Sequence, residues 1–146
     1  MKFTVASLAL AGLMAVGVMG ARNTVSAQAP KSQWDGIYTE AQAKRGEALY
    51  GQNCAQCHGA DLGGGEMAPG LAGGEFTSNW NDLSVGDLYE RIRVSMPQSA
   101  PGSLTRQQNS DILAYVLMKG KAPTGAAELS TDTNTLKAIK YLAAKP

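Results

Sequence analysis

The 146-residue sequence predicts an all-α fold, and three observations lead to this prediction. Two segments, 84–95 and 105–119, carry apolar residues at helical spacing and begin at a residue that can cap a helix. A third segment, 132–144, has Leu136, Ile139 and Leu142 at every third position. Gly- and Pro-rich stretches separate these segments, and strands do not alternate with helices as in a βαβ unit. We therefore expect a single domain with three to five helices.

The N-terminal segment, residues 1–27, has the features of a secretory signal peptide. Lys2 precedes an uncharged run from Val5 to Gly20, and small residues lead up to Ala27. We predict cleavage after Ala27, because cleavage after Ala29 would leave Pro30 next to the cut. An uncleaved membrane anchor is the alternative, since the run approaches the length that spans a bilayer, although its Gly and Ala residues make it weakly hydrophobic.

The first part of the mature chain is predicted to be a flexible lead followed by a helix. Residues 28–38 contain Pro, Ser and Gly without a period, which favours the flexible lead. Thr39 can cap a helix over 39–50, and Gly51 and Asn53 end it. Residues 59–74 contain seven glycines and one proline, so we predict a loop whose backbone can approach a cofactor closely.

Two further helices complete the predicted domain, residues 39–120, and a third belongs to a C-terminal extension. Ser84, with Asp87 three residues later, marks the start of the helix over 84–95. Prolines interrupt residues 96–103. Thr105 caps the helix over 105–119, which ends at Gly120. Residues 121–146 are predicted to form an extension whose short helix, 132–144, packs on the domain.

The motif C-x-x-C-H at residues 54–58 contains both cysteines and the single histidine of the chain. It is the attachment signature of a c-type haem. The thiols of Cys54 and Cys57 can each form a thioether with a haem vinyl group, and the imidazole of His58 then reaches the iron as the proximal axial ligand. We therefore expect the helices to surround one covalently bound haem c and its iron, which supplies apolar mass that a small domain lacks.

Other interpretations of this motif are weaker. A structural zinc site requires four ligands, and the chain has no fourth Cys or His. A thioredoxin-like pair belongs at a helix start in a βαβ pattern, whereas a Gly-rich stretch follows this motif. A disulfide between Cys54 and Cys57 is possible in an oxidising compartment, but it leaves His58 unexplained. A chance match can be rejected only by the surrounding pattern.

The second axial ligand cannot be a histidine, which leaves Met, Lys, Tyr, the chain terminus, water or an open position. Three methionines follow the predicted cleavage site: Met67, Met96 and Met118. Met67 lies too close to His58 to pass easily round the haem edge, and Met118 ends a helix in which it can fill the core. Met96 lies between two helices with enough chain to reach the opposite face. An ordinary loop methionine fits this spacing equally well.

Resemblance to a family favours Met96. The run from Ser95 to Leu104, with Gln107 and the run from Asp111 to Val116, resembles the methionine loop and final helix of class I bacterial cytochromes c. The mono-haem group that often serves quinoprotein dehydrogenases is similar, and the resemblance spans residues 39–119. It implies a cytochrome c fold, Met96 as the second axial ligand and attachment of the haem in the periplasm.

The resemblance also implies roles for two loop residues. The backbone carbonyl of Pro69 would accept the Nδ1 hydrogen of His58, which orients the ring and raises its basicity. Trp80 would lie near a haem propionate, although a Trp at the edge of the core fits the sequence equally well.

A helix crossing is implied as well. The helix that carries Gly46 and Tyr50 would cross the helix that carries Ile112 and Tyr115, because the glycine permits close contact between them.

These features predict a periplasmic one-electron carrier rather than an enzyme. A haem with His58 and Met96 as ligands has no open site for substrate. The expected partners are redox proteins, such as a quinoprotein dehydrogenase and a terminal oxidase. Alternatives are an electron-transfer subunit of a dehydrogenase complex, and a sensory or ligand-binding haem protein with an open iron site.

The charge composition excludes other partner classes. The whole chain has a formal net charge of +1. Without residues 1–27, 11 basic and 12 acidic side chains remain, with their signs interspersed. We therefore expect neither nucleic-acid binding nor a lysine-rich docking face. No integral membrane span is expected in the mature chain.

Overall fold

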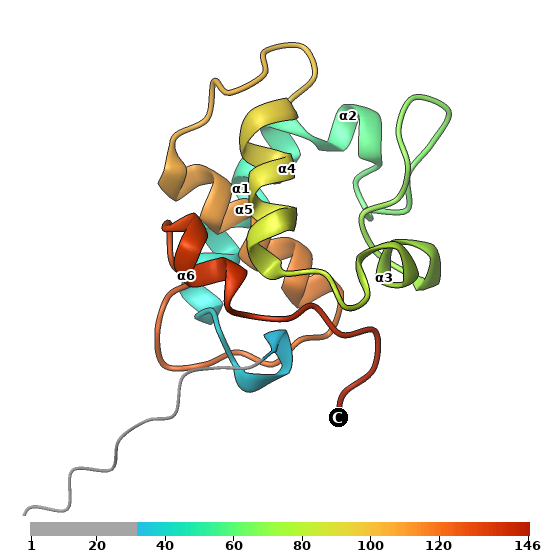
Figure 1. The fold of residues 1–146 in the computed structure, drawn as a ribbon. Coiled ribbons are helices and arrows are strands. Elements are labelled where there is room, and N and C mark those ends of the chain that lie inside the picture. The colour runs from blue at the N-terminus through green and yellow to red at the C-terminus, as the bar shows by residue number, and fades with distance from the viewer. Residues whose placement is uncertain (1–31) are drawn as a thin grey trace, which may run out of the picture.

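The computed structural model describes residues 32–146, so the predicted signal peptide lies outside the described residues. Within them the chain is helical and contains no strand, which confirms the predicted all-α class (Figure 1). The elements are the 3₁₀-helix η1 Gln33–Asp35 and the α-helices α1 Glu40–Asn53, α2 Ala55–His58, α3 Gly74–Trp80, α4 Val85–Ser95, α5 Arg106–Lys119 and α6 Thr133–Lys137. The six α-helices exceed the predicted three to five, because α2 and α3 are too short to show an apolar period.

The three long helices begin where their caps predict. The side chain of Thr39 accepts the backbone N–H of Gln42 at the start of α1, and Ser84 and Thr105 form capping boxes at the starts of α4 and α5. α1 continues to Asn53, beyond the predicted end at residue 50, and its last turn is closed by the Cys54 N–H, which donates to the Tyr50 carbonyl over 2.9 Å.

α1 crosses α5 in close backbone contact, as the resemblance implied. A Cβ atom on Gly46 would lie only 1.8 Å from the carbonyl oxygen of Asp111. One turn along the crossing, the rings of Tyr50 and Tyr115 pack with centroids 5.3 Å apart. Only glycine allows the two helices to approach this closely.

The prediction of a flexible lead is wrong for residues 32–38. Ser32 caps η1, and Ile37 and Tyr38 are buried. The Gln33 side chain donates to the Leu142 carbonyl over 2.6 Å and accepts the Leu142 N–H over 2.9 Å. These partners lie 109 residues away, so the local composition could not reveal them.

The C-terminal extension packs against α1, α4 and α5. The amide of Gln42 in α1 accepts the N–H of Leu129 over 2.6 Å and donates to its carbonyl over 3.2 Å, so its polar atoms are satisfied inside the core. At Gly86 in α4, a Cβ atom would lie 2.5 Å from the backbone nitrogen of Lys137. Five apolar side chains of the extension are buried: Ala122, Leu129, Leu136, Ile139 and Tyr141.

The last helix is shorter than the predicted 132–144. Asp132 caps α6, which ends at Lys137. Beyond it, Val85 donates to the Ile139 carbonyl and Tyr141 donates to the Leu83 carbonyl, each over 2.8 Å. Pairing with the segment before α4 replaces the helical hydrogen bonds. No helix among residues 32–146 is both long and apolar enough to cross a membrane.

The hydrogen bond between Glu90 of α4 and Thr133 of α6, with the ion pair of Glu90 and Arg93, is expected to make the free energy of unfolding depend on pH. Glu90 accepts from Arg93 over 2.8 Å and from the Thr133 hydroxyl, and these hydrogen bonds lower its pKa to about 2. Because an unfolded Glu has a pKa of about 4.3, the contribution is complete above that pH and is lost as the pH falls through about 2. Glu90→Gln should therefore destabilise the protein at pH 7 and much less at pH 2, measured by denaturant unfolding.

The matched control is Glu47→Gln, because Glu47 forms no ion pair with the described residues. An equal loss from Glu90→Gln at both pH values would contradict the assignment.

Candidate cofactor site

One cavity of about 850 Å³ brings together all six site residues predicted from the sequence. Its walls are formed by the end of α1, α2, the Gly-rich loop, α3, α4, the loop after α4 and one side of α5. The predicted residues that line it are Cys54, Cys57, His58, Pro69, Trp80 and Met96. The volume lies within the range of small-molecule and cofactor sites.

Cys54 lies at the junction of α1 and α2, Cys57 lies within α2, and both are free thiols. The backbone N–H groups of Cys57 and His58 both donate to the Cys54 carbonyl, so one tight turn positions all three side chains. Burial and the nearby Cys57 raise the pKa of Cys54 to about 11. This is the opposite of the lowered pKa in a thioredoxin-like pair. Among residues 32–146, no group of three or more His, Cys, Asp or Glu side chains is placed to hold a metal ion.

The imidazole of His58 is buried and held by the Gly-rich loop. Its Nδ1 lies 2.8 Å from the carbonyl oxygen of Pro69, the contact that the resemblance implied. A carbonyl can only accept, so Nδ1 carries the hydrogen and Nε2 keeps a free lone pair. Gly64, with φ +83°, makes this loop possible, because a Cβ there would lie 2.4 Å from the Gly70 nitrogen.

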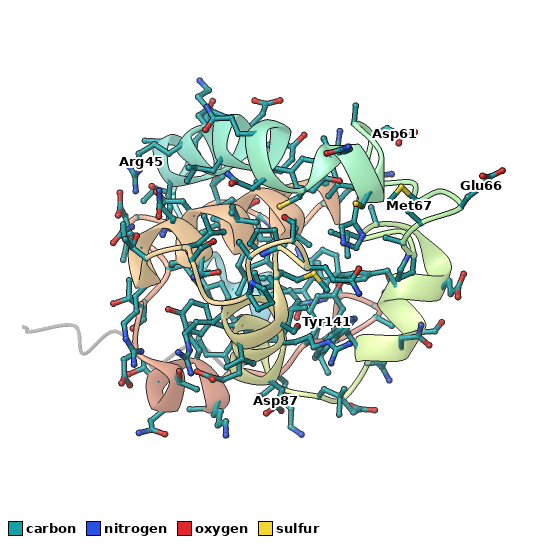
Figure 2. All side chains as sticks on the ribbon, turned by 90° about the horizontal axis from the view of Figure 1, so that it is seen from above. Arg45, Asp61, Glu66, Met67, Asp87 and Tyr141 are labelled. Carbon is teal, nitrogen blue, oxygen red and sulfur yellow. The ribbon has the colours of Figure 1, made fainter. Side chains whose placement is uncertain are left out.

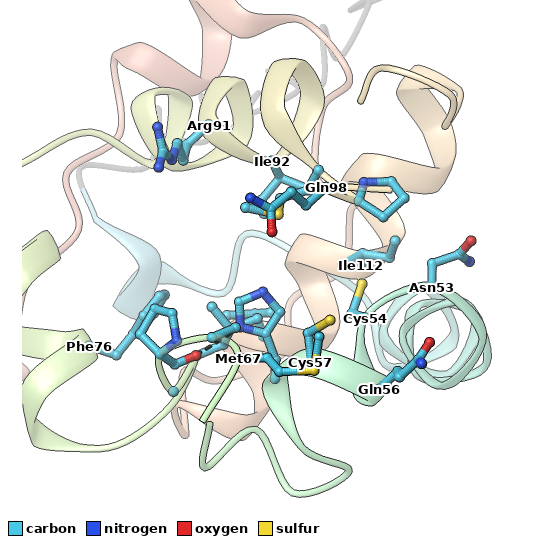
Figure 3. A pocket seen from close by; sticks show the side chains of 18 of the residues that line it. Asn53, Cys54, Gln56, Cys57, Met67, Phe76, Arg91, Ile92, Gln98 and Ile112 are labelled. Carbon is cyan, nitrogen blue, oxygen red and sulfur yellow. Dashed lines mark hydrogen bonds between the residues drawn. The ribbon is translucent and has the colours of Figure 1, made fainter. Parts of the chain in front are cut away.

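The wall opposite the thiols comes from α4 and the loop that follows it. Figure 3 shows Ile92 and Gln98 across the cavity from Cys57 and Met67. Met96 caps the C-terminus of α4, where its N–H donates to the Ile92 carbonyl over 2.9 Å, so it begins the loop on that opposite wall.

The other two methionines have different surroundings. Met67 lies on the side of Cys57 and is 72% exposed (Figure 3). Met118 packs against the hydrophobic core and does not line the cavity.

The end of the cavity away from Cys54 holds an arginine that sequence reasoning missed. Arg91 lines the cavity from α4, and Figure 3 shows it with Phe76 at that end. Its guanidinium has no hydrogen-bond or ion-pair partner within residues 32–146. Trp80 lines the cavity and also packs on Phe76, with ring centroids 6.2 Å apart, so it is a lining residue and a core-edge residue at once. No local pattern distinguishes Arg91 from Arg93, which pairs with Glu90.

The donor set fits a covalently attached haem. Two free thiols, an imidazole with a free lone pair and a thioether line one cavity, and the unpaired Arg91 offers a cation for carboxylates at the far end. The aliphatic side chains of Leu88, Ile92, Ile112 and Val116 supply apolar walls for a macrocycle.

Comparison with known proteins gives a family match. The family model described as cytochrome C oxidase, cbb3-type, subunit III matches residues 41–116, more than half of the chain. The chain is 33% identical over 79 residues to the cbb3-type cytochrome c oxidase subunit CcoP of Rubrivivax gelatinosus. The matched region covers 53% of this chain and 26% of that protein. It is also 36% identical over 63 residues to cytochrome c-551 of Bacillus subtilis (strain 168). That matched region covers 43% of this chain and 54% of that protein.

A solved structure is also similar: the sulfane dehydrogenase SoxCD of Paracoccus pantotrophus, with a TM-score of 0.47 and 21% identity over 74% of this chain and 61% of that chain. The chain spans about a quarter of the length of the CcoP relative and about half that of cytochrome c-551.

The family match contains the C-x-x-C-H motif, Pro69, Trp80 and Met96, and it ends before the C-terminal extension. It agrees with the resemblance to class I c-type cytochromes and with the helical fold. The chain therefore belongs to the cytochrome c family of electron carriers represented by the cbb3-type subunit III domain.

Proposed function

We propose that the protein is a one-electron carrier that holds a single haem c through Cys54, Cys57, His58 and Met96. The observation that supports this most strongly is that these four donor side chains line one cavity, with Nδ1 of His58 engaged by Pro69. When bound, haem c supplies an iron that alternates between the ferric and ferrous states.

Each residue has a distinct role in this proposal. Cys54 and Cys57 form the thioethers that anchor the haem. Nε2 of His58 is the proximal donor, and the carbonyl of Pro69 keeps the ring oriented and raises its basicity. The thioether of Met96, from the opposite wall, favours the ferrous state and closes the position at which a substrate could bind.

The haem carboxylates are assigned to the other end of the cavity. Arg91 supplies a charge partner for them, and Trp80 supplies an indole N–H donor. Both lie within the matched family region.

The location and partners follow from the same proposal. Residues 1–27 serve as a signal peptide and direct the protein to the periplasm. Residues 39–120 form the haem domain, and residues 121–146 are an extension packed on it. The proposed electron donor is a dehydrogenase, such as a quinoprotein dehydrogenase, or another respiratory donor, and the proposed acceptor is of the terminal oxidase type. The proposal gives the protein no role in peroxide cleavage, because its single histidine is assigned to the iron and no second histidine is present for an arginine-histidine site.

A second candidate is an electron-transfer subunit, which the match to an oxidase subunit III model favours. The haem chemistry is the same, and the two functions differ in whether the protein remains fixed to a complex. Stable copurification with an oxidase or dehydrogenase at stoichiometric amounts would favour the subunit, whereas recovery as a free protein would favour the carrier.

The visible absorption spectrum tests the proposal. Protein exported in a host with haem-attachment machinery should show a sharp reduced α-band, and its oxidised form should show the weak far-red band of sulfur-to-iron ligation. A covalent haem with a high-spin spectrum would move the conclusion to ligand binding. Absence of covalent haem would exclude the cytochrome function.

A further inference from the structure

The charges of the chain are segregated, which corrects the expectation of interspersed signs. Residues 46–90 contain seven acidic side chains and no Lys or Arg. This stretch comprises most of α1, the haem motif, the Gly-rich loop, α3 and the start of α4. Over residues 32–146 the balance is nearly even, with ten basic and twelve acidic side chains. The asymmetry therefore concerns where the charges lie, and the total charge does not reveal it.

Four other acidic side chains of the described residues form ion pairs with basic partners. Glu40 pairs with Lys44 over 3.0 Å, and Glu90 pairs with Arg93 over 2.8 Å. Arg45 pairs with both Asp111 and Glu128, over 3.0 and 2.9 Å. Their charges are largely cancelled locally.

Three acidic side chains remain uncompensated beside the cavity. Asp61, Glu66 and Glu75 are exposed and form no ion pair with the described residues. Within residues 32–146, Asp61 accepts a single hydrogen bond, from the backbone N–H of Gly63 over 3.0 Å. Figure 2 shows Asp61, Glu66 and Met67 at the same end of the molecule, while Arg45 lies at the opposite end.

This surface is continuous with the cavity. Glu75 and Met67 both line it, and Met67 is 72% exposed. We call the exposed surface that carries Asp61, Glu66, Glu75 and Met67 the acidic face. The single Lys or Arg among the cavity-lining residues that the structure describes is Arg91, which is assigned to the haem carboxylates.

We propose that the acidic face is the docking surface for a redox partner whose own docking surface is basic. This inference rests on the proposed function. The acidic face borders the cavity wall that would carry the haem thioethers, so a partner docked there lies close to the proposed haem. Uncancelled negative charge steers a basic surface to this wall and disfavours an acidic one. Met67 adds a flexible apolar contact that a partner can cover, a type of residue enriched in interfaces.

Voltammetry of the full exported holoprotein on two monolayer-coated gold electrodes tests the orientation. An amine-terminated monolayer represents the basic partner, and a carboxylate-terminated monolayer represents an acidic one. Electron transfer at low ionic strength should be about tenfold or more faster on the amine surface, and this preference should disappear at high salt.

Two triple variants, each of which removes three negative charges, distinguish the effect of the acidic face from the effect of net charge. Asp61→Asn, Glu66→Gln and Glu75→Gln together should abolish the preference. Glu40→Gln, Glu128→Gln and Asp132→Asn together should retain it; asparagine can still cap α6.

Equal rates of wild type on both surfaces, or equal losses in the two triple variants, would overturn the docking proposal. A covalent haem spectrum together with such results would leave the carrier function standing. Absence of covalent haem and of a redox wave on either surface would overturn the carrier function and the docking proposal together.

Discussion

Met96→Ala is expected to abolish the low-spin spectrum of the holoprotein and to lower its reduction potential. The thioether of Met96 is the proposed donor from the wall opposite Cys57, and alanine has no group that can replace it. The far-red band of the oxidised form should disappear. The potential should fall by more than about 59 mV, which corresponds to a tenfold change in a one-electron equilibrium.

The other methionines provide matched controls. Met67→Ala removes a side chain that is 72% exposed on the side of Cys57, and Met118→Leu replaces one that packs against the core with one of similar volume. Both variants should keep the low-spin spectrum. The assignment of Met96 is wrong if its alanine variant retains the far-red band, or if Met67→Ala loses it.

Gly46→Ala is expected to cause the largest loss of stability of any single methyl addition to α1. The added Cβ would lie 1.8 Å from the carbonyl oxygen of Asp111 and 3.0 Å from the Cβ of Tyr115. The first of these atoms belongs to the α5 backbone, so no side-chain rotation relieves the clash and the two helices must separate. Separation disturbs the packing of Tyr50 on Tyr115 and the ion pair of Arg45 with Asp111.

We expect Gly46→Ala to lower the free energy of unfolding by about 3 kcal/mol or more, at the upper end of overpacking effects. Denaturant unfolding of the exported holoprotein measures it. Gly51→Ala is the control on the same helix, because a Cβ there has no neighbour within 4 Å. It should stabilise α1 by about 0.5–1 kcal/mol, since alanine is the better helix former. Similar stabilities for the two variants would contradict the close helix crossing.

The two variants, Met96→Ala and Gly46→Ala, distinguish effects on the cofactor site from effects on the stability of the fold. Met96→Ala should change the haem spectrum while the protein stays folded. Gly46→Ala should reduce stability, and whatever folded protein remains should keep the His58 and Met96 ligation.

Local chemistry in the sequence determined the long helices and the candidate cofactor site. Thr39, Ser84 and Thr105 mark helix starts because each side chain accepts a hydrogen bond from the backbone N–H three positions later. The C-x-x-C-H motif places its three side chains on one turn, so its chemistry follows from spacing alone. Such features depend on neighbours along the chain and can be read without the fold.

Tertiary structure decided the features whose partners are distant in sequence. Residues 32–38 are ordered because Gln33 binds Leu142, and α6 stops at Lys137 because the following residues pair with the segment before α4. Arg91 and Arg93 lie two residues apart on one helix, yet one lines the cavity and the other pairs with Glu90. Which acidic side chains remain without an ion-pair partner beside the cavity likewise depends on which cations the fold brings near them.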